Sequence, residues 1–154
     1  MTGKIAKRLA DLNIELPAPR APVANYVPAV KTGNHIYIAG QVCVWNGEYR
    51  HLGHLGGNVS VEQGQEAARL CGLNIIAQLQ AALGDLDRVR QCIKLNVFVS
   101  SVPTFTDQPK VANGASDLIV QVFGETGRHA RSAVGVAALP LGVSVEVDAA
   151  FEFA

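Results

Sequence analysis

The sequence predicts an α+β fold in which two helices pack on one face of a single sheet of about six strands. Three observations support this prediction. A long apolar segment with start and stop signals for a helix spans residues 60–84, alternating apolar runs typical of strands lie on both sides of it, and a second helical segment follows Pro109. The expected order is β-β-α-β-α-β-β. The 154 residues, 49% of them apolar, suit one domain with a substantial core.

The N-terminal segment predicts a short helix followed by extended backbone. Ile5, Leu9 and Leu12 recur at helical spacing, so we expect an amphipathic helix over residues 3–13. Prolines at positions 17, 19 and 22 then favour an extended chain. This extension, about residues 1–21, lacks the apolar run of a signal peptide, and no run in the chain approaches the roughly 18 residues of a membrane span. We therefore expect a cytoplasmic protein that does not enter a membrane.

The first hairpin and the long helix have clear local signals. Thr32-Gly33-Asn34 separates two β-rich runs, as a hairpin turn does. Pro28 precedes the turn and places the first strand at a sheet edge, because proline cannot donate a ladder hydrogen bond. Ser60 and Gln63 match a capping box at the start of the long helix, and Gly84 can end it.

One strand and one helix follow the long helix. Residues 89–100 form the predicted strand, in which alternate positions are apolar: Ile93, Leu95, Val97 and Val99. A second helix is expected over about residues 110–123, after Pro109.

The last segment predicts a second hairpin, with residues 139–142 as its turn and Ala138 opposite Val143. Side chains alternate along each strand, so Val134, Val136, Val145 and Val147 should face the core. The other face then combines small residues with isolated charges: Arg131, Ala133, Gly135 and Ala137 beside Ser144, Glu146, Asp148 and Ala150.

Arg131 has two interpretations, which the residues alone favour about equally. It can form a salt bridge with Glu146 or Asp148, contributing under ~1 kcal/mol if exposed. Alternatively, its planar guanidinium binds a carboxylate or phosphate at a surface of small residues. In the predicted register Arg131 and Glu146 are separated by roughly 13 Å. A contact between them is easier if a neighbouring subunit supplies Glu146.

The histidines, the cysteines and the overall charge give weaker indications of function. His51 and His54 could bind a metal, but no third ligand is placed near them, and exposed loop histidines are commoner. His129 lies near Arg131 and is expected to be a bystander. The three cysteines, Cys43, Cys71 and Cys92, lack metal-ligand spacing and suit buried reduced thiols. Thirteen basic residues balance thirteen acidic ones, which gives no electrostatic footprint for nucleic acid.

Several stretches resemble the RidA/YjgF family of enamine/imine deaminases. "RSAVGVAALPLGVSVEVDA" resembles its C-terminal signature, in which an arginine is followed by Leu-Pro and by an acidic residue in the last strand. "NYVPAVKTGNHIYIAGQV" resembles the family's first hairpin, and "QEAARLCGLNIIAQLQAALGDLDRVRQCIKLNVFVS" its first helix and following strand. The resemblance covers the chain from about residue 22 onward.

The resemblance implies a chorismate-mutase-like fold with a mixed sheet, and a homotrimer with ligand clefts at the subunit junctions. It implies that Arg131 pairs with the carboxylate of a short imino acid and that Glu146 positions or activates water. The substrate-binding residues it implies are Tyr26, Gly40, Ala133, Asn113 and Ser116. The last two are alternatives for a second-helix residue of the cleft, with Asn113 the first candidate. No metal or organic cofactor is implied.

The resemblance thus implies hydrolytic deamination of 2-aminoacrylate-type acids, which releases ammonia and a 2-oxo acid. A non-catalytic sensor that binds small carboxylates is the alternative. An endoribonuclease is less favoured, because the chain lacks a stripe of basic and aromatic residues. The chain departs from the family at Ala133, where cysteine is common, and in its N-terminal extension.

Overall fold

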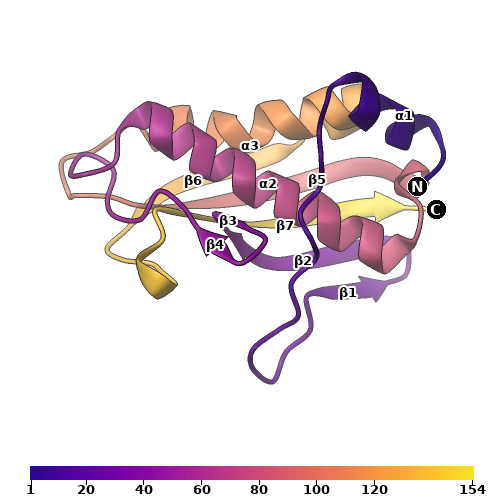
Figure 1. The fold of residues 1–154 in the computed structure, drawn as a ribbon, viewed down its shortest axis with the longest axis horizontal. Helices are drawn as coiled ribbons and strands as arrows, with labels where there is room; N and C mark the ends of the chain where they lie inside the picture. Colours follow the sequence, from indigo (N-terminus) through magenta and orange to yellow (C-terminus); the bar gives the residue numbers. More distant parts are fainter.

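The computed structural model describes residues 1–154 and has two layers, a sheet and the helices that cover one of its faces (Figure 1). The α-helices are α1 (Lys4–Asp11), α2 (Val61–Leu83) and α3 (Gln108–Phe123). The strands are β1 (Ala29–Thr32), β2 (His35–Val42), β3 (Val44–Trp45), β4 (Glu48–Tyr49), β5 (Val89–Ser100), β6 (Ala130–Val136) and β7 (Val145–Phe153). Three short 3₁₀ turns complete it: η1 (Leu86–Arg88), η2 (Gly124–Gly127) and η3 (Pro140–Gly142).

The α+β class is confirmed, but the count of elements is not. The structure has seven strands and three α-helices, where six and two were expected. Five strands form the main sheet in the order β1-β2-β7-β5-β6, and β3 and β4 form a separate two-stranded ribbon. The sheet is mixed, because β5 and β6 run parallel while the other neighbours are antiparallel.

The predicted C-terminal hairpin is wrong. β6 pairs with β5, and β7 lies between β2 and β5, so β6 and β7 are not neighbours and Ala138 does not pair with Val143. The physical reason is that α3 forms a crossover from β5 to a parallel β6, which occupies the edge beside β5. The chain then turns at η3, where Leu141 has a left-handed φ of 62°, and returns to the middle of the sheet.

The side-chain phase of β6 is therefore opposite to the predicted one. β7 buries Val145 and Val147 as expected, but Val134 of β6 is 46% exposed and Ala133 packs against the core instead. We call the face beneath α2 and α3 the covered face and the other face the open face. The open face carries Tyr37, Val134 and Glu146, and the first two are about half exposed.

The other local predictions hold, with small shifts. β1 and β2 form the first hairpin with β1 at the edge. The capping box of Ser60 and Gln63 is present at α2, and Gly84 ends the helix in the left-handed conformation. α3 begins at Gln108, two residues before the expected start. In β5 an irregularity between Cys92 and Lys94 shifts the alternation, so Cys92 is buried and Ile93 is exposed.

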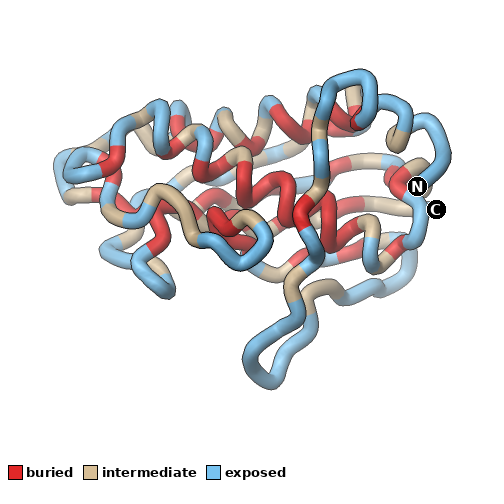
Figure 2. The backbone as a smooth tube through the Cα atoms, viewed as in Figure 1, coloured by how far each residue is buried: buried red, intermediate tan, exposed pale blue.

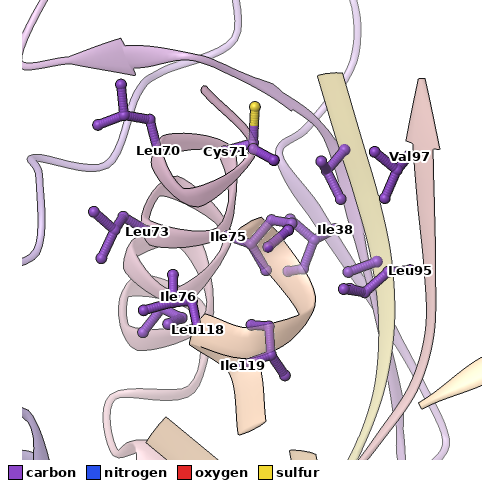
Figure 3. Close-up of a cluster of buried hydrophobic side chains, with 14 of the residues drawn as sticks. Ile38, Leu70, Cys71, Leu73, Ile75, Ile76, Leu95, Val97, Leu118 and Ile119 are labelled. Carbon is purple, nitrogen blue, oxygen red and sulfur yellow. The ribbon is translucent and has the colours of Figure 1, made fainter. Parts of the chain in front are cut away.

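The core lies between the two helices and the covered face of the sheet (Figures 2 and 3). Figure 2 shows the buried positions concentrated along α2 and the central strands. In Figure 3 side chains of α2, α3 and the sheet meet, and those labelled are Ile38, Leu70, Cys71, Leu73, Ile75, Ile76, Leu95, Val97, Leu118 and Ile119. The helices approach closely at Gly114, where a Cβ atom would overlap the backbone carbonyl oxygen of Gln65.

The N-terminal extension is joined to this core. The Asp87 carboxylate accepts hydrogen bonds from the backbone N–H groups of Lys4 and Ile5, both at 2.7 Å, and so caps the start of α1. These hydrogen bonds lower the pKa of Asp87. Arg8 donates from Nε to the Gln121 carbonyl of α3 at 2.7 Å, and Leu9 is buried in the core.

Candidate active site

Arg131 lies on the covered face of β6 against the first turns of α3. Its Nη1 donates to Asn113 Oδ1 at 2.9 Å and to Ser116 Oγ at 3.1 Å, and its Nη2 makes a longer contact of 3.4 Å with the Pro109 carbonyl. Asn113 and Ser116 are three residues apart and therefore share one side of the helix. Because Nη1 has only two hydrogens, both are used within the chain. The Nε–Nη2 edge of the guanidinium is the one left for a bidentate carboxylate.

Glu146 faces the opposite side, the open face of β7. Its carboxylate lies against Gly40, where a Cβ atom would be 2.7 Å from Oε1. Gly40 sits in the irregular part of β2, between the paired residues Ile38 and Gln41. Only glycine leaves room for the carboxylate here, so the backbone of β2 and the side chain from β7 shape one small site.

A cavity of ≈ 290 Å³ opens at Glu146. That size is at the small end of ligand pockets in proteins. Its lining includes Tyr26 and Gly40, both expected from the sequence, and Arg20 of the N-terminal extension, which was not expected. Arg20 is held by a 2.7 Å hydrogen bond from Nη2 to the Tyr49 hydroxyl.

The Glu146 carboxyl has a raised pKa. Its partial burial is the main cause, and the negative charge of Asp148 two residues along the strand adds to it. None of the five ion pairs in the structure includes Glu146, Asp148 or Arg131. Asp148 instead accepts a 2.7 Å hydrogen bond from Asn96. The salt-bridge interpretation of Arg131 is therefore wrong within one chain.

The expectation that Arg131 and Glu146 share a face is also wrong, because β6 pairs with β5 and not with β7. The predicted residues instead fall into two groups. The arginine half-site contains Arg131, Asn113, Ser116 and Ala133, the last half-buried on the same face of β6. The glutamate half-site contains Glu146, Tyr26 and Gly40.

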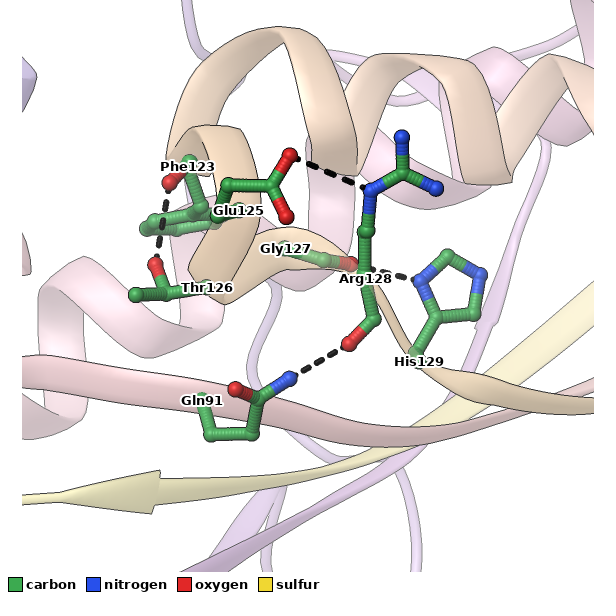
Figure 4. Close-up of polar contacts among 7 residues, drawn as sticks. All are labelled: Gln91, Phe123, Glu125, Thr126, Gly127, Arg128 and His129. Atoms are coloured by element: carbon green, nitrogen blue, oxygen red, sulfur yellow. Dashed lines mark hydrogen bonds and ion pairs between the residues drawn. The ribbon is translucent and has the colours of Figure 1, made fainter.

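His129, expected from the sequence to be a bystander, belongs to the arginine half-site. Its Nε2 lies 2.9 Å from Ser116 Oγ. Its Nδ1 lies 2.7 Å from the Gly127 carbonyl oxygen, a contact drawn in Figure 4. His129 and Arg131 are two residues apart at the start of a strand, so strand alternation would have placed both side chains on one face.

The remaining singled-out residues make structural contacts. His51 pairs with Glu66 at 3.1 Å, and His54 Nε2 contacts the Ala137 carbonyl at 3.1 Å. No group of three or more His, Cys, Asp or Glu side chains is placed to hold a metal ion. No helix combines the length and the apolar character needed to cross a membrane.

The three cysteines are buried and unpaired, as expected. Burial raises the pKa of the Cys92 thiol to about 12 and raises that of Cys71 as well. Such thiols are poor nucleophiles. A larger cavity, ≈ 620 Å³ between α1, β5 and η2, contains none of the predicted site residues.

Comparison with known proteins gives consistent matches along the chain. Residues 6–151 match the family model described as "YjgF/chorismate_mutase-like, putative endoribonuclease". Protein TCP17 of Trypanosoma cruzi is 54% identical over 98% of this chain and 95% of its own length. A 2-iminobutanoate/2-iminopropanoate deaminase of Dermatophagoides farinae is 26% identical over 88% of this chain and 91% of its own.

Among solved structures, the protein Atu1372 of Agrobacterium tumefaciens is similar over nearly the whole chain. It superposes with a TM-score of 0.91 at 50% identity, covering 97% of this chain and 92% of that one.

Proposed function

Since this chain belongs to the YjgF/chorismate mutase-like family, we propose that it hydrolyses short imino or enamino carboxylic acids to 2-oxo acids and ammonia. The observation that supports this most directly is the guanidinium of Arg131, which two hydrogen bonds from Nη1 hold in place. On its other edge Nε makes no hydrogen bond within the chain and Nη2 makes only the 3.4 Å contact with Pro109, so this edge can take a carboxylate. The relative from Dermatophagoides farinae is named as a deaminase of such imino acids. The small cavity at Glu146 suits a substrate of this size.

We also propose that the working site forms between two subunits of a homotrimer. Arg131 and Glu146 lie on opposite faces of the sheet. One chain therefore cannot bring its own arginine half-site and glutamate half-site together around one substrate. The open face exposes large apolar side chains, among them Val30, Tyr37 and Val134 at 52%, 50% and 46%. A face of this kind is typical of a protein–protein interface. A neighbouring chain packed on it would bring its arginine half-site to this chain's glutamate half-site, which is the arrangement of a closed ring.

The chemistry in this site needs one bound carboxylate and one oriented water. Arg131 binds the substrate carboxylate and fixes the position of the imine carbon. In the iminium form of the substrate, the Glu146 carboxylate takes a proton from water as the water oxygen bonds to the imine carbon. The electron pair of the C=N double bond moves to the nitrogen, which gives a neutral carbinolamine. The protonated Glu146 then gives that proton to the nitrogen. The C–N bond breaks as the carbinolamine hydroxyl passes its proton to Glu146 and becomes the carbonyl of a 2-oxo acid, and the ammonia that leaves takes up this proton as ammonium. The raised pKa of Glu146 suits a group that both accepts and returns a proton.

The test is ammonia release from freshly generated iminopyruvate in the presence of the full-length protein. We expect acceleration over buffer by the wild type, and its loss in Arg131→Ala. Arg128→Ala is the matched control, because Arg128 lies three residues away and its side chain pairs only with Glu125. Equal rates for the wild type and Arg131→Ala would refute the proposed anchor.

Two other outcomes separate the alternative functions. Saturable binding of pyruvate without any turnover of imino acids would identify a carboxylate sensor. RNA cleavage that survives both Arg131→Ala and further purification would identify a separate ribonuclease site. The balance of thirteen basic and thirteen acidic residues does not favour that result.

A further inference from the structure

We propose that His129 is a positioning residue that holds the carboxylate-binding edge of Arg131 in place through the hydroxyl of Ser116. This inference rests on the proposed function only in taking Arg131 as the anchor. Three contacts form a chain from the guanidinium inward: Arg131 Nη1 to Ser116 Oγ at 3.1 Å, Ser116 Oγ to His129 Nε2 at 2.9 Å, and His129 Nδ1 to the Gly127 carbonyl at 2.7 Å.

The direction of each hydrogen bond follows from the last one. A carbonyl oxygen can only accept, so Nδ1 of His129 carries a hydrogen and donates it to Gly127. In the neutral ring Nε2 is then an acceptor, and the Ser116 hydroxyl donates to it. The Ser116 oxygen keeps its lone pairs for Arg131. The single hydroxyl hydrogen of Ser116 is therefore donated to His129. The Ser116 oxygen can then act only as an acceptor for the guanidinium.

The backbone that His129 contacts is firmly held (Figure 4). Gly127 is buried, and a Cβ atom there would lie 2.5 Å from the Ile119 carbonyl oxygen of α3. The next carbonyl, of Arg128, accepts a hydrogen bond from the Gln91 side chain of β5. Since this loop is tied to both the helix and the sheet, it gives His129 a fixed base from which to orient Ser116.

The experiment measures pyruvate binding by calorimetry with the full-length protein and four variants: His129→Ala, Ser116→Ala, the double variant and His35→Ala. His129→Ala and Ser116→Ala should each weaken binding by about two- to tenfold, the effect of one lost hydrogen bond. The double variant should be no weaker than Ser116→Ala, because His129 acts through that hydroxyl. Additive losses in the double variant would overturn the inference. His35 is the matched control, a histidine in β2 with no side-chain hydrogen bond, and its removal should change nothing.

A ligand-free measurement separates this inference from the proposed function. Nitrogen-15 relaxation of Arg131 Nε should show a more mobile side chain in His129→Ala and in Ser116→Ala than in the wild type. If pyruvate binds equally well to the wild type and to Arg131→Ala, the proposed anchor is wrong, and the mobility result alone decides the role of His129. Unchanged mobility in both variants would refute that role even if Arg131 proves to bind pyruvate.

Discussion

Arg131 and Glu146 lie on opposite faces of the same sheet. Arg131 stands beside Leu95 of β5 and reaches α3, whereas Glu146 stands beside Phe98 and lies against Gly40 on the open face. Leu95 is fully buried beneath the helices, which fixes the face to which Arg131 belongs. A site that uses both residues therefore needs two chains.

The first prediction is that two inactive variants restore activity when their subunits are mixed. Arg131→Ala retains an intact glutamate half-site, and Glu146→Gln retains an intact arginine half-site. In a closed trimer refolded from equal amounts of both, roughly a quarter of the intersubunit sites would combine an intact Arg131 with an intact Glu146. Ammonia release by the mixture should reach about that fraction of the wild-type rate. Recovery should be zero if each chain uses its own two residues.

The second prediction concerns Glu146 and stability. Its pKa is raised in the folded protein, so ionisation opposes folding, and the loss of stability sets in as pH rises above the range where unfolded glutamate titrates. Glu146→Gln keeps the shape without the charge. It should raise the melting temperature near pH 7.5 and leave it almost unchanged near pH 4, where the carboxyl is largely protonated.

Glu15→Gln is the control for this comparison, because Glu15 is exposed and takes part in no ion pair. A melting temperature of Glu146→Gln that falls at the higher pH would contradict the burial of this charge.

The third prediction concerns the close contact of Gly40. In Gly40→Ala the new methyl group would meet the Glu146 carboxylate, which has to move because the backbone cannot. We expect a loss of ammonia release on the order of 10–100-fold, the effect of a misplaced catalytic group. The melting temperature should change little, since the displaced atoms are the end of a side chain. A large loss of stability that persists in the Glu146→Ala background would instead show that the substitution distorts the backbone at Gly40.

The fourth prediction concerns the packing of α2 on α3. Gly114→Ala inserts a methyl group into the backbone carbonyl of Gln65, and neither helix can yield as a flexible side chain would. Overpacking of this kind should lower the free energy of unfolding by about 1–3 kcal/mol. Asp117→Ala, on the exposed side of the same helix, should change it by less than about 0.5 kcal/mol. Urea denaturation of both variants measures the difference.

The elements whose signals are local were predictable from the sequence. The capping box of Ser60 and Gln63 depends on residues three apart, and the turn after Thr32 on its neighbours, so both appear in the structure as expected. The alternation of β7 also identifies its buried face without knowledge of its partners. Each of these features is decided within a few residues.

The prediction of which distant strands pair with each other was wrong. Two consecutive strands with a short connection favour a hairpin, but nothing near Ala138 reveals that α3 has already placed β6 beside β5. The phase of β6 was then assigned from the wrong partner, which put Arg131 and Glu146 on one face. The residue types of the candidate site were recognisable, and their arrangement depends on topology that strand alternation alone does not encode.

The position of β7 affects how the chain folds during its synthesis on the ribosome. β7 is synthesised after every other strand, yet it lies in the middle of the sheet with β2 on one side and β5 on the other. Until it emerges, β2 and β5 have no common neighbour, and their unpaired edges are open to other chains. Nascent molecules that lack β7 are therefore the form of this protein most exposed to aggregation, and the sheet closes in a late step that joins segments more than a hundred residues apart in sequence.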